Sequence, residues 1–214
     1  MGLTVRYWKR ITLPSNDVPL IIEFTLLNKR KQNKMKKTVL FISLVLATGL
    51  LFAQKKTTTS AIINFDASTS LDALPKAENK TAIASLDIKT GKLAFEAPIK
   101  SFTFSNPKIQ EHFNSKGWMD SNQFETASFT GNITNLAAVK FAKDGTYNVD
   151  VVGDLTLHGV TKPIVTKGTI TSKGGAITAA STFKIKLEDY RVNGGAVGAG
   201  KVSKEPVITV SAVF

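Results

Sequence analysis

The side chains that could carry acid–base or metal chemistry are few in this chain, and their spacing matches no established site. There are two histidines, His112 and His158, and no cysteine. A zinc site needs three or four ligands at short, regular spacings, and acid–base catalysis needs groups that meet around a substrate. Glu188 and Asp189 are adjacent, so on a strand they would point to opposite faces. We therefore expect no metal, no cofactor and no catalytic residue.

Two motifs associated with catalysis are incomplete. Residues 195–201 (GAVGAGK) match the first seven positions of a phosphate-binding loop, but Val202 stands where that loop needs a hydroxyl for Mg²⁺. A strand-like run follows instead of a helix, so we interpret this segment as a connection between strands. No G-x-S-x-G turn is present, and a hydrolase with an unrecognised Ser/His/Asp set that includes His158 stays as an alternative only.

Apolar residues alternate with polar ones along most of the chain after residue 54. Tyr147, Val149, Val151, Leu155 and Leu157 share one parity, and mainly polar residues hold the other. Such alternation puts one face of a strand against an apolar interior and the other in water. The same alternation recurs at 63–67, 127–133 and 177–187, and runs rich in Val, Ile, Thr and Phe occupy 82–88, 92–104, 160–172 and 207–214.

Turn sequences separate these runs. KTG at 89–91, KDG at 143–145 and KGG at 173–175 are typical of hairpin connections. About eight antiparallel strands without βαβ alternation predict an all-β fold, either a closed barrel or a sandwich. We favour an antiparallel, lipocalin-like β-barrel, because closure leaves no exposed strand edge.

One segment predicts a short helix between strands. Asn106 before Pro107 is typical of a helix start, and apolar residues follow at helical spacing before Gly117. Aromatic residues gather around this segment, and we interpret them as packing the helix over one barrel end, with a hydrophobic entrance as the functional alternative. They are Phe113, Trp118, Phe124 and Phe129.

The interior of the barrel is the candidate binding site. A barrel of about eight strands either fills its interior with side chains or holds one small ligand, and small residues on the presumed inner face predict an elongated apolar space: Ala67, Ala97, Ala127, Gly131, Gly153 and Ala179. We expect the ligand to contact apolar inward residues and the aromatic entrance, namely Phe129, Tyr147, Val149, Val151, Leu155, Leu157, Phe183, Ile185, Phe113 and Trp118. His158 is a further candidate at the rim, although we favour a structural hydrogen bond that holds its turn.

An apolar segment near the N-terminus has the form of a secretory signal peptide. The segment begins at Met35, which is followed by the basic residues Lys36 and Lys37. An unbroken apolar run then occupies 38–52, and Ala53 precedes polar residues. The run is shorter than the roughly 20 residues that span a bilayer, so we expect cleavage after Ala53 and a periplasmic or secreted domain at 54–214, with a retained anchor as the alternative. Residues 1–34 are interpreted as a start-site artefact or a disordered extension.

The charge of the chain is concentrated ahead of that domain. The formal net charge is +12, but residues 1–53 hold nine Lys/Arg and two Asp/Glu, which leaves 19 basic and 14 acidic residues, or +5, for 54–214. Lysines are spread singly there, as on solvated strand faces, so we expect no nucleic-acid partner. The absence of cysteine also excludes thiol catalysis, iron–sulfur clusters and a lipoprotein anchored through an N-terminal cysteine.

Several stretches resemble the YceI-like family. They are EHFN at 111–114, FETASFTG at 124–131, DGTYNV at 144–149 and GDLTLHGVTKP at 153–163, with Asp189-Tyr190 resembling a later Asp–aromatic pair. The resemblance spans roughly residues 57–214 and implies an extended lipocalin-like barrel with a helix. It also implies export to the periplasm and the binding of long chains such as polyisoprenoids, quinone precursors or fatty-acid derivatives. It transfers no catalytic residue.

The leading hypothesis is an exported binding protein that holds a long-chain apolar or amphiphilic ligand in its barrel, as a carrier or reservoir. The alternative is a structural or stress-related envelope domain with a filled core and a protein partner. The ligand, its donor and acceptor, and homodimer formation stay open. The interior decides between the hypotheses, because a carrier needs a dry, elongated hollow.

Overall fold

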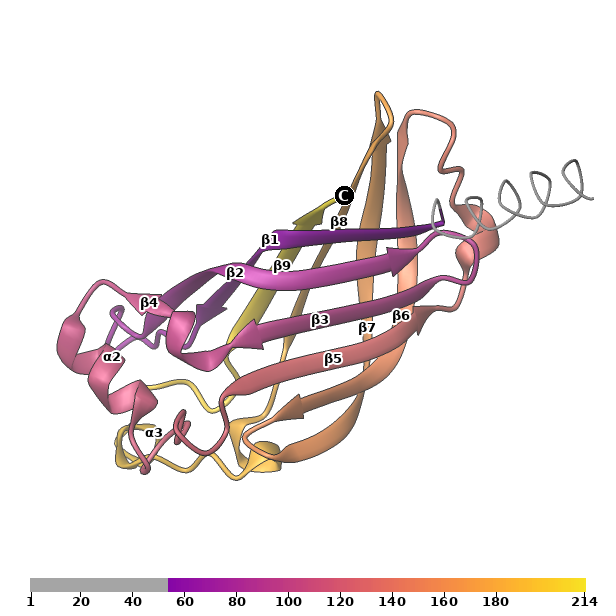
Figure 1. Ribbon diagram of the computed structural model, residues 1–214. Coiled ribbons are helices and arrows are strands. Elements are labelled where there is room, and N and C mark those ends of the chain that lie inside the picture. Colours follow the sequence, from indigo (N-terminus) through magenta and orange to yellow (C-terminus); the bar gives the residue numbers. More distant parts are fainter. Residues whose placement is uncertain (1–53) are drawn as a thin grey trace, which may run out of the picture. The chain divides into compact units, whose positions relative to one another are not determined.

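The computed structural model of this protein describes residues 54–214, which form a closed antiparallel barrel (Figure 1). Eight strands close it in the order β1-β9-β8-β7-β6-β5-β3-β2, with β2 paired back to β1, and a short ninth strand, β4, extends one end of β2. The predicted barrel is confirmed. The strands are β1 Lys55–Asp66, β2 Lys76–Asp87, β3 Lys92–Pro98, β4 Thr103–Phe104, β5 Thr126–Ile133, β6 Gly145–Leu157, β7 Val160–Lys173, β8 Ala176–Lys184 and β9 Val207–Val213.

Short helices occupy the connections between strands. They are η1 Ile99–Ser101, α2 Pro107–Asn114, η2 Leu136–Ala138, η3 Leu187–Tyr190 and α3 Gly195–Gly198. The predicted helix, α2, starts as expected: the Asn106 side-chain oxygen accepts a hydrogen bond from the Lys108 N–H at 2.9 Å. It ends before Gly117, because the N–H and hydroxyl of Ser115 both donate to the His112 carbonyl. Among residues 54–214, no helix is long and apolar enough to cross a membrane.

The predicted alternation and turns are present in the β6–β7–β8 hairpins. Val149 and Val151 of β6 are buried, whereas Asn148 between two inward positions is exposed. The β6–β7 turn is His158-Gly159, with φ of 50° and 72°, and the β7–β8 turn is Gly174-Gly175, with φ of 58° and 86°. Two-residue turns with positive φ match the twist of paired strands.

One expected strand is divided. The run at 92–104 forms β3, then η1, then β4, because proline supplies no N–H and ends regular pairing at Pro98. The Asn79 side chain, fully buried, donates to the Pro98 carbonyl at 2.9 Å, and the Ile99 N–H donates to the Glu125 carbonyl. These bonds replace the ladder that the sequence predicted there.

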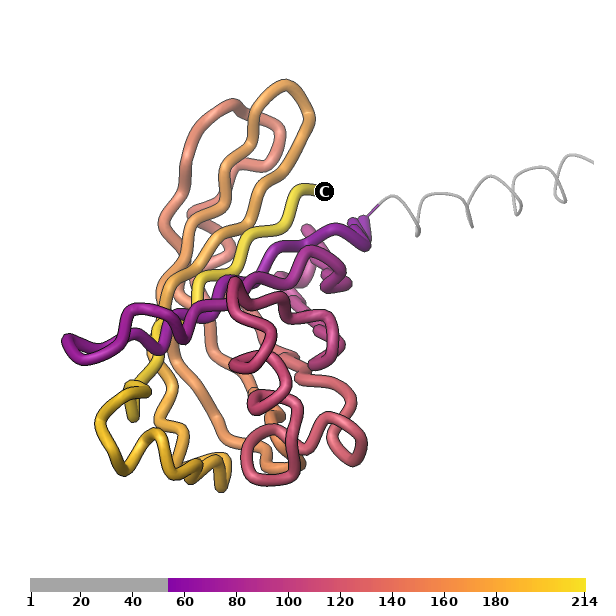
Figure 2. Tube along the Cα trace, turned by 90° about the vertical axis from the view of Figure 1, so that its left-hand side faces the viewer, coloured from indigo at the N-terminus to yellow at the C-terminus, as the bar shows by residue number. Residues whose placement is uncertain are grey.

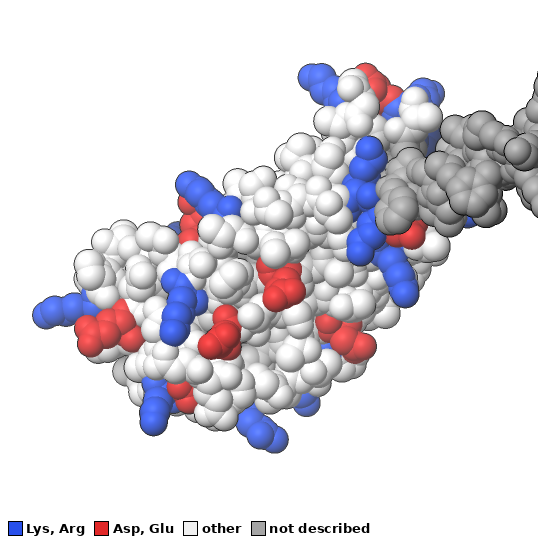
Figure 3. All heavy atoms as spheres, viewed as in Figure 1, with Lys and Arg blue, Asp and Glu red and all other residues white. Residues whose placement is uncertain are grey.

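The two ends of the barrel are covered differently (Figures 1 and 2). The α2 segment and the connection 185–206 gather at one end, while the β7–β8 hairpin and the connection 134–144 project beyond the other. The expected signal peptide at 35–53 and the 34 residues before it lie outside the described residues. Basic and acidic side chains are interspersed over the face drawn in Figure 3.

The aromatic residues near α2 do not form the one cluster that the sequence predicted. Phe113 packs against Phe65, Phe102 and Phe104, with ring centroids 6.0, 5.9 and 4.9 Å away, so it does hold α2 over the barrel end. Trp118 packs against the same core cluster as Phe113 and contacts Gly194. The other two predicted members lie elsewhere: Phe124 against His158 at 4.4 Å and Phe129 on the wall of β5 and β6. Proximity in sequence was a poor guide because the chain turns sharply between these residues.

Candidate functional site

The barrel encloses an apolar cavity of about 150 Å³. Inward side chains of β1, β3 and β5 to β9 form its wall, and residues of α2 and η3 border one end. Cavities of roughly 150 Å³ with aliphatic and aromatic linings stay dry and admit small apolar molecules. The space is therefore suited to hydrocarbon and unsuited to a solvated polar group.

Several inward side chains keep part of their surface accessible. Phe95, Leu155 and Phe183 line the cavity, yet each is only half-buried. In a barrel with a filled interior, such residues would be fully covered by the opposite wall. Their incomplete burial is consistent with the cavity that they line.

Glycines on two neighbouring strands help to keep the space open. Gly131 of β5 and Gly153 of β6 are cross-strand partners, and a Cβ on either would lie 2.5–2.6 Å from Cζ of Phe129. The Phe129 ring therefore lies along the wall, over both glycines, instead of reaching across the barrel. Of the small residues that the sequence placed inside, Ala97, Ala127 and Ala179 line the cavity.

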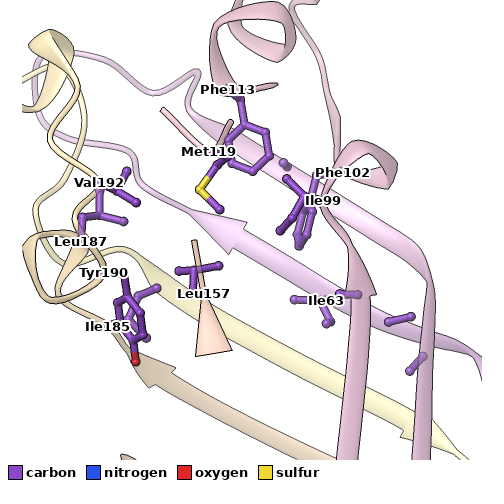
Figure 4. Packing of buried hydrophobic residues seen from close by; sticks show 14 of the residues in the cluster. Ile63, Ile99, Phe102, Phe113, Met119, Leu157, Ile185, Leu187, Tyr190 and Val192 are labelled. Carbon is purple, nitrogen blue, oxygen red and sulfur yellow. The ribbon is translucent and has the colours of Figure 1, made fainter. Parts of the chain in front are cut away.

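Packed side chains close both ends of the cavity. At the end covered by α2, Phe113 and Met119 lie opposite Leu187 and Val192 (Figure 4). At the other end lies a second buried cluster. Its members Leu93, Val149, Val151, Ile170 and Ala179 line the cavity, whereas Leu86, Ile133, Val139 and Ile177 do not. The cavity is therefore bordered by packed apolar side chains at both ends.

The structure brings nine of the eleven predicted contact residues to the cavity wall. Phe113, Trp118, Phe129, Val149, Val151, Leu155, Leu157, Phe183 and Ile185 line it. Their role in binding a ligand remains a prediction, whereas their common location is a structural finding.

Two predicted contact residues are placed elsewhere. The Tyr147 hydroxyl donates to the Lys143 carbonyl at 3.0 Å, and its ring packs against the cluster that fills the far end. Tyr147 has the inward parity, but it stands too close to the strand end to reach the cavity.

His158 is the second of these, and it has the structural role that we favoured. Its Nδ1 lies 3.0 Å from the Tyr190 carbonyl oxygen. Because a carbonyl only accepts, Nδ1 carries a proton. The bond links the β6–β7 turn to η3, and burial raises the pKa of the Tyr190 hydroxyl, with the negative charge of Asp189 adding to the effect.

Residues on β1, β3 and β9 also line the cavity, although the sequence analysis did not select them. Phe65, Phe95, Ile208 and Val210 belong to this group. Their signal was available, since each sits in an alternating apolar run. Parity alone does not tell which part of a strand faces a hollow and which faces a plug.

The side chains with other chemistry are dispersed in residues 54–214, where no three His, Asp or Glu side chains gather as a metal site would require. Glu188 and Asp189 lie on η3, not on a strand, and both are exposed. The glycine-rich segment forms the single turn α3 within the connection to β9.

Comparison with known sequences identifies the family. Residues 49–214 match the YceI-like domain. A UPF0312 protein of Pseudomonas fluorescens is 42% identical over 64 residues, 30% of this chain and 31% of that protein. A UPF0312 protein of Pseudomonas savastanoi is 33% identical over 112 residues, 50% of this chain and 55% of that protein. The chain thus spans about half the length, or less, of these curated relatives.

Two solved structures share the fold. A polyisoprenoid binding domain from Saccharophagus degradans, implicated in plant cell wall breakdown, superposes with a TM-score of 0.63 at 16% identity, covering 75% of this chain and 97% of that one. BcnA of Burkholderia cenocepacia superposes with a TM-score of 0.60 at 17% identity, covering 72% and 96%. At such identities the likeness concerns the fold, and together with the domain match it shows that this chain belongs to the YceI-like family.

Proposed function

We propose that this protein binds one long-chain apolar or amphiphilic molecule inside its barrel and acts as an exported carrier or reservoir. The observation that carries the proposal is the dry cavity between two packed ends. A polyisoprenoid, a quinone precursor and a fatty-acid derivative all have the required hydrocarbon chain. A solved protein of the same fold is a polyisoprenoid binding domain, which supports this ligand class.

Affinity would come mainly from burial of the chain. Each CH₂ group removed from water contributes about 0.8 kcal/mol, and the lining offers few hydrogen-bonding side chains. The half-buried inward residues, such as Phe95 and Phe183, would turn aside to admit successive segments of the chain. In this part of the site, selectivity would then depend on the length and width of the ligand's hydrocarbon chain more than on its headgroup.

We propose a binding role without catalysis. A Ser/His/Asp mechanism needs the histidine between a nucleophile and a carboxylate. His158 instead faces the backbone carbonyl of Tyr190 and the ring of Phe124. The alternative of an envelope domain with a filled core draws no support from a hollow interior.

Export belongs to the proposal and rests on residues 35–53. N-terminal sequencing of the secreted product tests it, and we expect a mature start at or near Gln54. A mature start far from Gln54, or a product that stays in the cytoplasm, would overturn the export step without touching the binding proposal.

Native mass spectrometry of protein purified gently from its original host tests the binding itself. We expect a mass excess that corresponds to one prenyl or acyl lipid per chain and that disappears after extraction with organic solvent. The extracted protein should then take up a prenyl or acyl chain again. A clean apoprotein that binds neither kind of chain would refute the proposal.

A further inference from the structure

The barrel wall is not paired along its whole length. The β7–β8 ladder runs from Lys173 and Ala176 to Gly168 and Ser181, and there it stops. Residues 160–167 of β7 continue to pair with β6, and residues 182–184 of β8 continue to pair with β9. The two strands leave their hairpin together and separate toward the end that holds α3 (Figure 1).

Hydrogen bonds join the two sides of this stretch, in which β7 and β8 are not paired with each other, at both of its ends. At the end nearer the β7–β8 hairpin, the Ser181 hydroxyl donates to the Lys167 carbonyl at 2.8 Å, and its oxygen lies 3.2 Å from the hydroxyl oxygen of Thr166. At the other end, nearer the β6–β7 turn, His158 Nδ1 donates to the carbonyl of Tyr190. We call the stretch between these two ends the lateral opening; residues 160–167 form one side and residues 182–190 the other.

The cavity lies directly behind the lateral opening. Residues from both of its sides line the cavity, and Ile164, Thr166, Phe183 and Ile185 are among them. The lining also includes Thr169 and Ala180, which have the outward parity and sit beside the last paired residues. Packed side chains occupy both ends of the barrel, and beside the cavity the hydrogen-bonded ladder of the wall is interrupted between β7 and β8.

A single charged residue shares the face of these strands that looks into the barrel. On β6 to β9, Lys162 is the one charged side chain with the inward parity, and its cross-strand partner Leu155 lines the cavity. Lys162 is exposed, and neither ion pair found in residues 54–214 includes it. Other charges nearby have the outward parity of the strands or lie at or on η3: Lys167, Lys184, Asp150, Asp154, Lys186, Glu188 and Asp189.

We propose that the lateral opening is the entrance to the cavity, and that Lys162 holds there the anionic headgroup, a carboxylate or a phosphate, of a long-chain amphiphile. The chain passes between β7 and β8 while the headgroup stays at the surface, beside an ammonium that can snorkel along apolar surface. The inference rests on the proposed function and adds to it the route and the charge of the ligand.

The route is tested by blocking the opening in a protein that has no other thiol. A Thr166→Cys variant, or Ser181→Cys on the opposite side, is labelled with a bulky maleimide. Thr171→Cys, on the outer face where β7 and β8 are fully paired, is the matched control. Uptake of the fluorescent fatty acid cis-parinaric acid is followed by stopped flow, and circular dichroism verifies the fold. We expect association to slow by about tenfold or more with the first two labels and to stay unchanged with the third.

The headgroup is tested with Lys162→Met, which keeps an apolar stem, and with Lys167→Met as the control on the outer face of the same strand. We expect the affinity for cis-parinaric acid to fall about three- to fivefold at low salt in the first variant only, the range of one partly exposed ion pair. The affinity for the methyl ester of the same acid should not change. Displacement by farnesyl phosphate but not farnesol would indicate a phosphate ligand.

The outcomes separate this inference from the function on which it rests. If unmodified protein binds neither probe, the proposed function fails and the entrance with it. If the probes bind but labels at positions 166 and 181 both leave association unchanged, the lateral opening is not the entrance. If Lys162→Met weakens acid and ester equally, or neither, the anionic headgroup is wrong.

Discussion

The ring of Phe129 lies against the backbone of Gly153, its diagonal neighbour across the β5–β6 ladder. Gly131 stands opposite Gly153 and leaves the same space free, so the ring of Phe129 lies flat along the barrel wall over both glycines. A large aromatic side chain is thereby placed inside the barrel without filling it. The hollow interior depends on this arrangement as much as on the alanines.

Replacement of this glycine tests the arrangement. In Gly153→Ala, the new Cβ would lie 2.6 Å from both Phe129 Cζ and Gly131 Cα, so we expect the free energy of unfolding to fall by about 1–3 kcal/mol, as for other overpacked cores. Urea unfolding measures it. Gly195→Ala is the control, because nothing lies within 4 Å of its Cβ position. Equal stability of the two variants would show that both the Phe129 ring and the neighbouring β5 backbone at Thr130 and Gly131 shift to make room.

Filling the cavity should reduce binding without unfolding the barrel. Ala97 of β3 lines the cavity, whereas Ala94 of the same strand has the outward parity. We expect Ala97→Leu to weaken the binding of a prenyl or acyl chain by about tenfold, because it displaces one or two buried CH₂ groups. Ala94→Leu should leave the affinity unchanged. Fluorescence titration measures both, and equal affinities would place the ligand outside the cavity.

The His158–Tyr190 hydrogen bond should contribute measurably to stability. His158→Asn keeps a residue that tolerates the positive φ at this position but shortens the side chain that reaches the Tyr190 carbonyl. We expect the free energy of unfolding to fall by about 1–3 kcal/mol, the cost of an unsatisfied buried acceptor. His112→Asn, on the exposed face of α2, is the control. A loss no larger than in that control would mean that the bond is dispensable.

The buried hydroxyl of Tyr190 should make the protein sensitive to alkali. Its pKa is raised from the usual 10.0 by burial, so the unfolded chain loses this proton at a lower pH than the folded one. The stability linked to Tyr190 is therefore fully present below about pH 10 and falls as the pH rises through the higher folded pKa. We expect Tyr190→Phe to lessen the fall in melting temperature between pH 9 and 11. Tyr147→Phe serves as the control, and identical pH profiles would contradict the prediction.

Much of the fold could be predicted because its signals are local. Alternation at 147–157 identified β6 and its inward face, and KGG at 173–175 identified the β7–β8 turn. Asn106 before Pro107 identified the start of α2. Each of these features depends on neighbours a few residues away, so a single sequence contains the whole signal.

The arrangement of the site was less accessible, as Tyr147 and Phe129 show. Both have the inward parity, but Tyr147 joins the packed far end and Phe129 lies along the wall. The position of a side chain along the barrel axis depends on the register of every strand from β1 to β9. The alternation within one strand does not specify that register.

By itself, then, the sequence determined most of the strands, several of their turns and the apolar character of one face, because those properties follow from backbone preference and from the period of two. Only the tertiary structure decided that this face surrounds a hollow, that Gly131 and Gly153 meet beneath Phe129, and that the ladder ends at Gly168 and Ser181. These relations join residues far apart in the chain. They exist only once the barrel has closed, since closure sets the distances between facing walls.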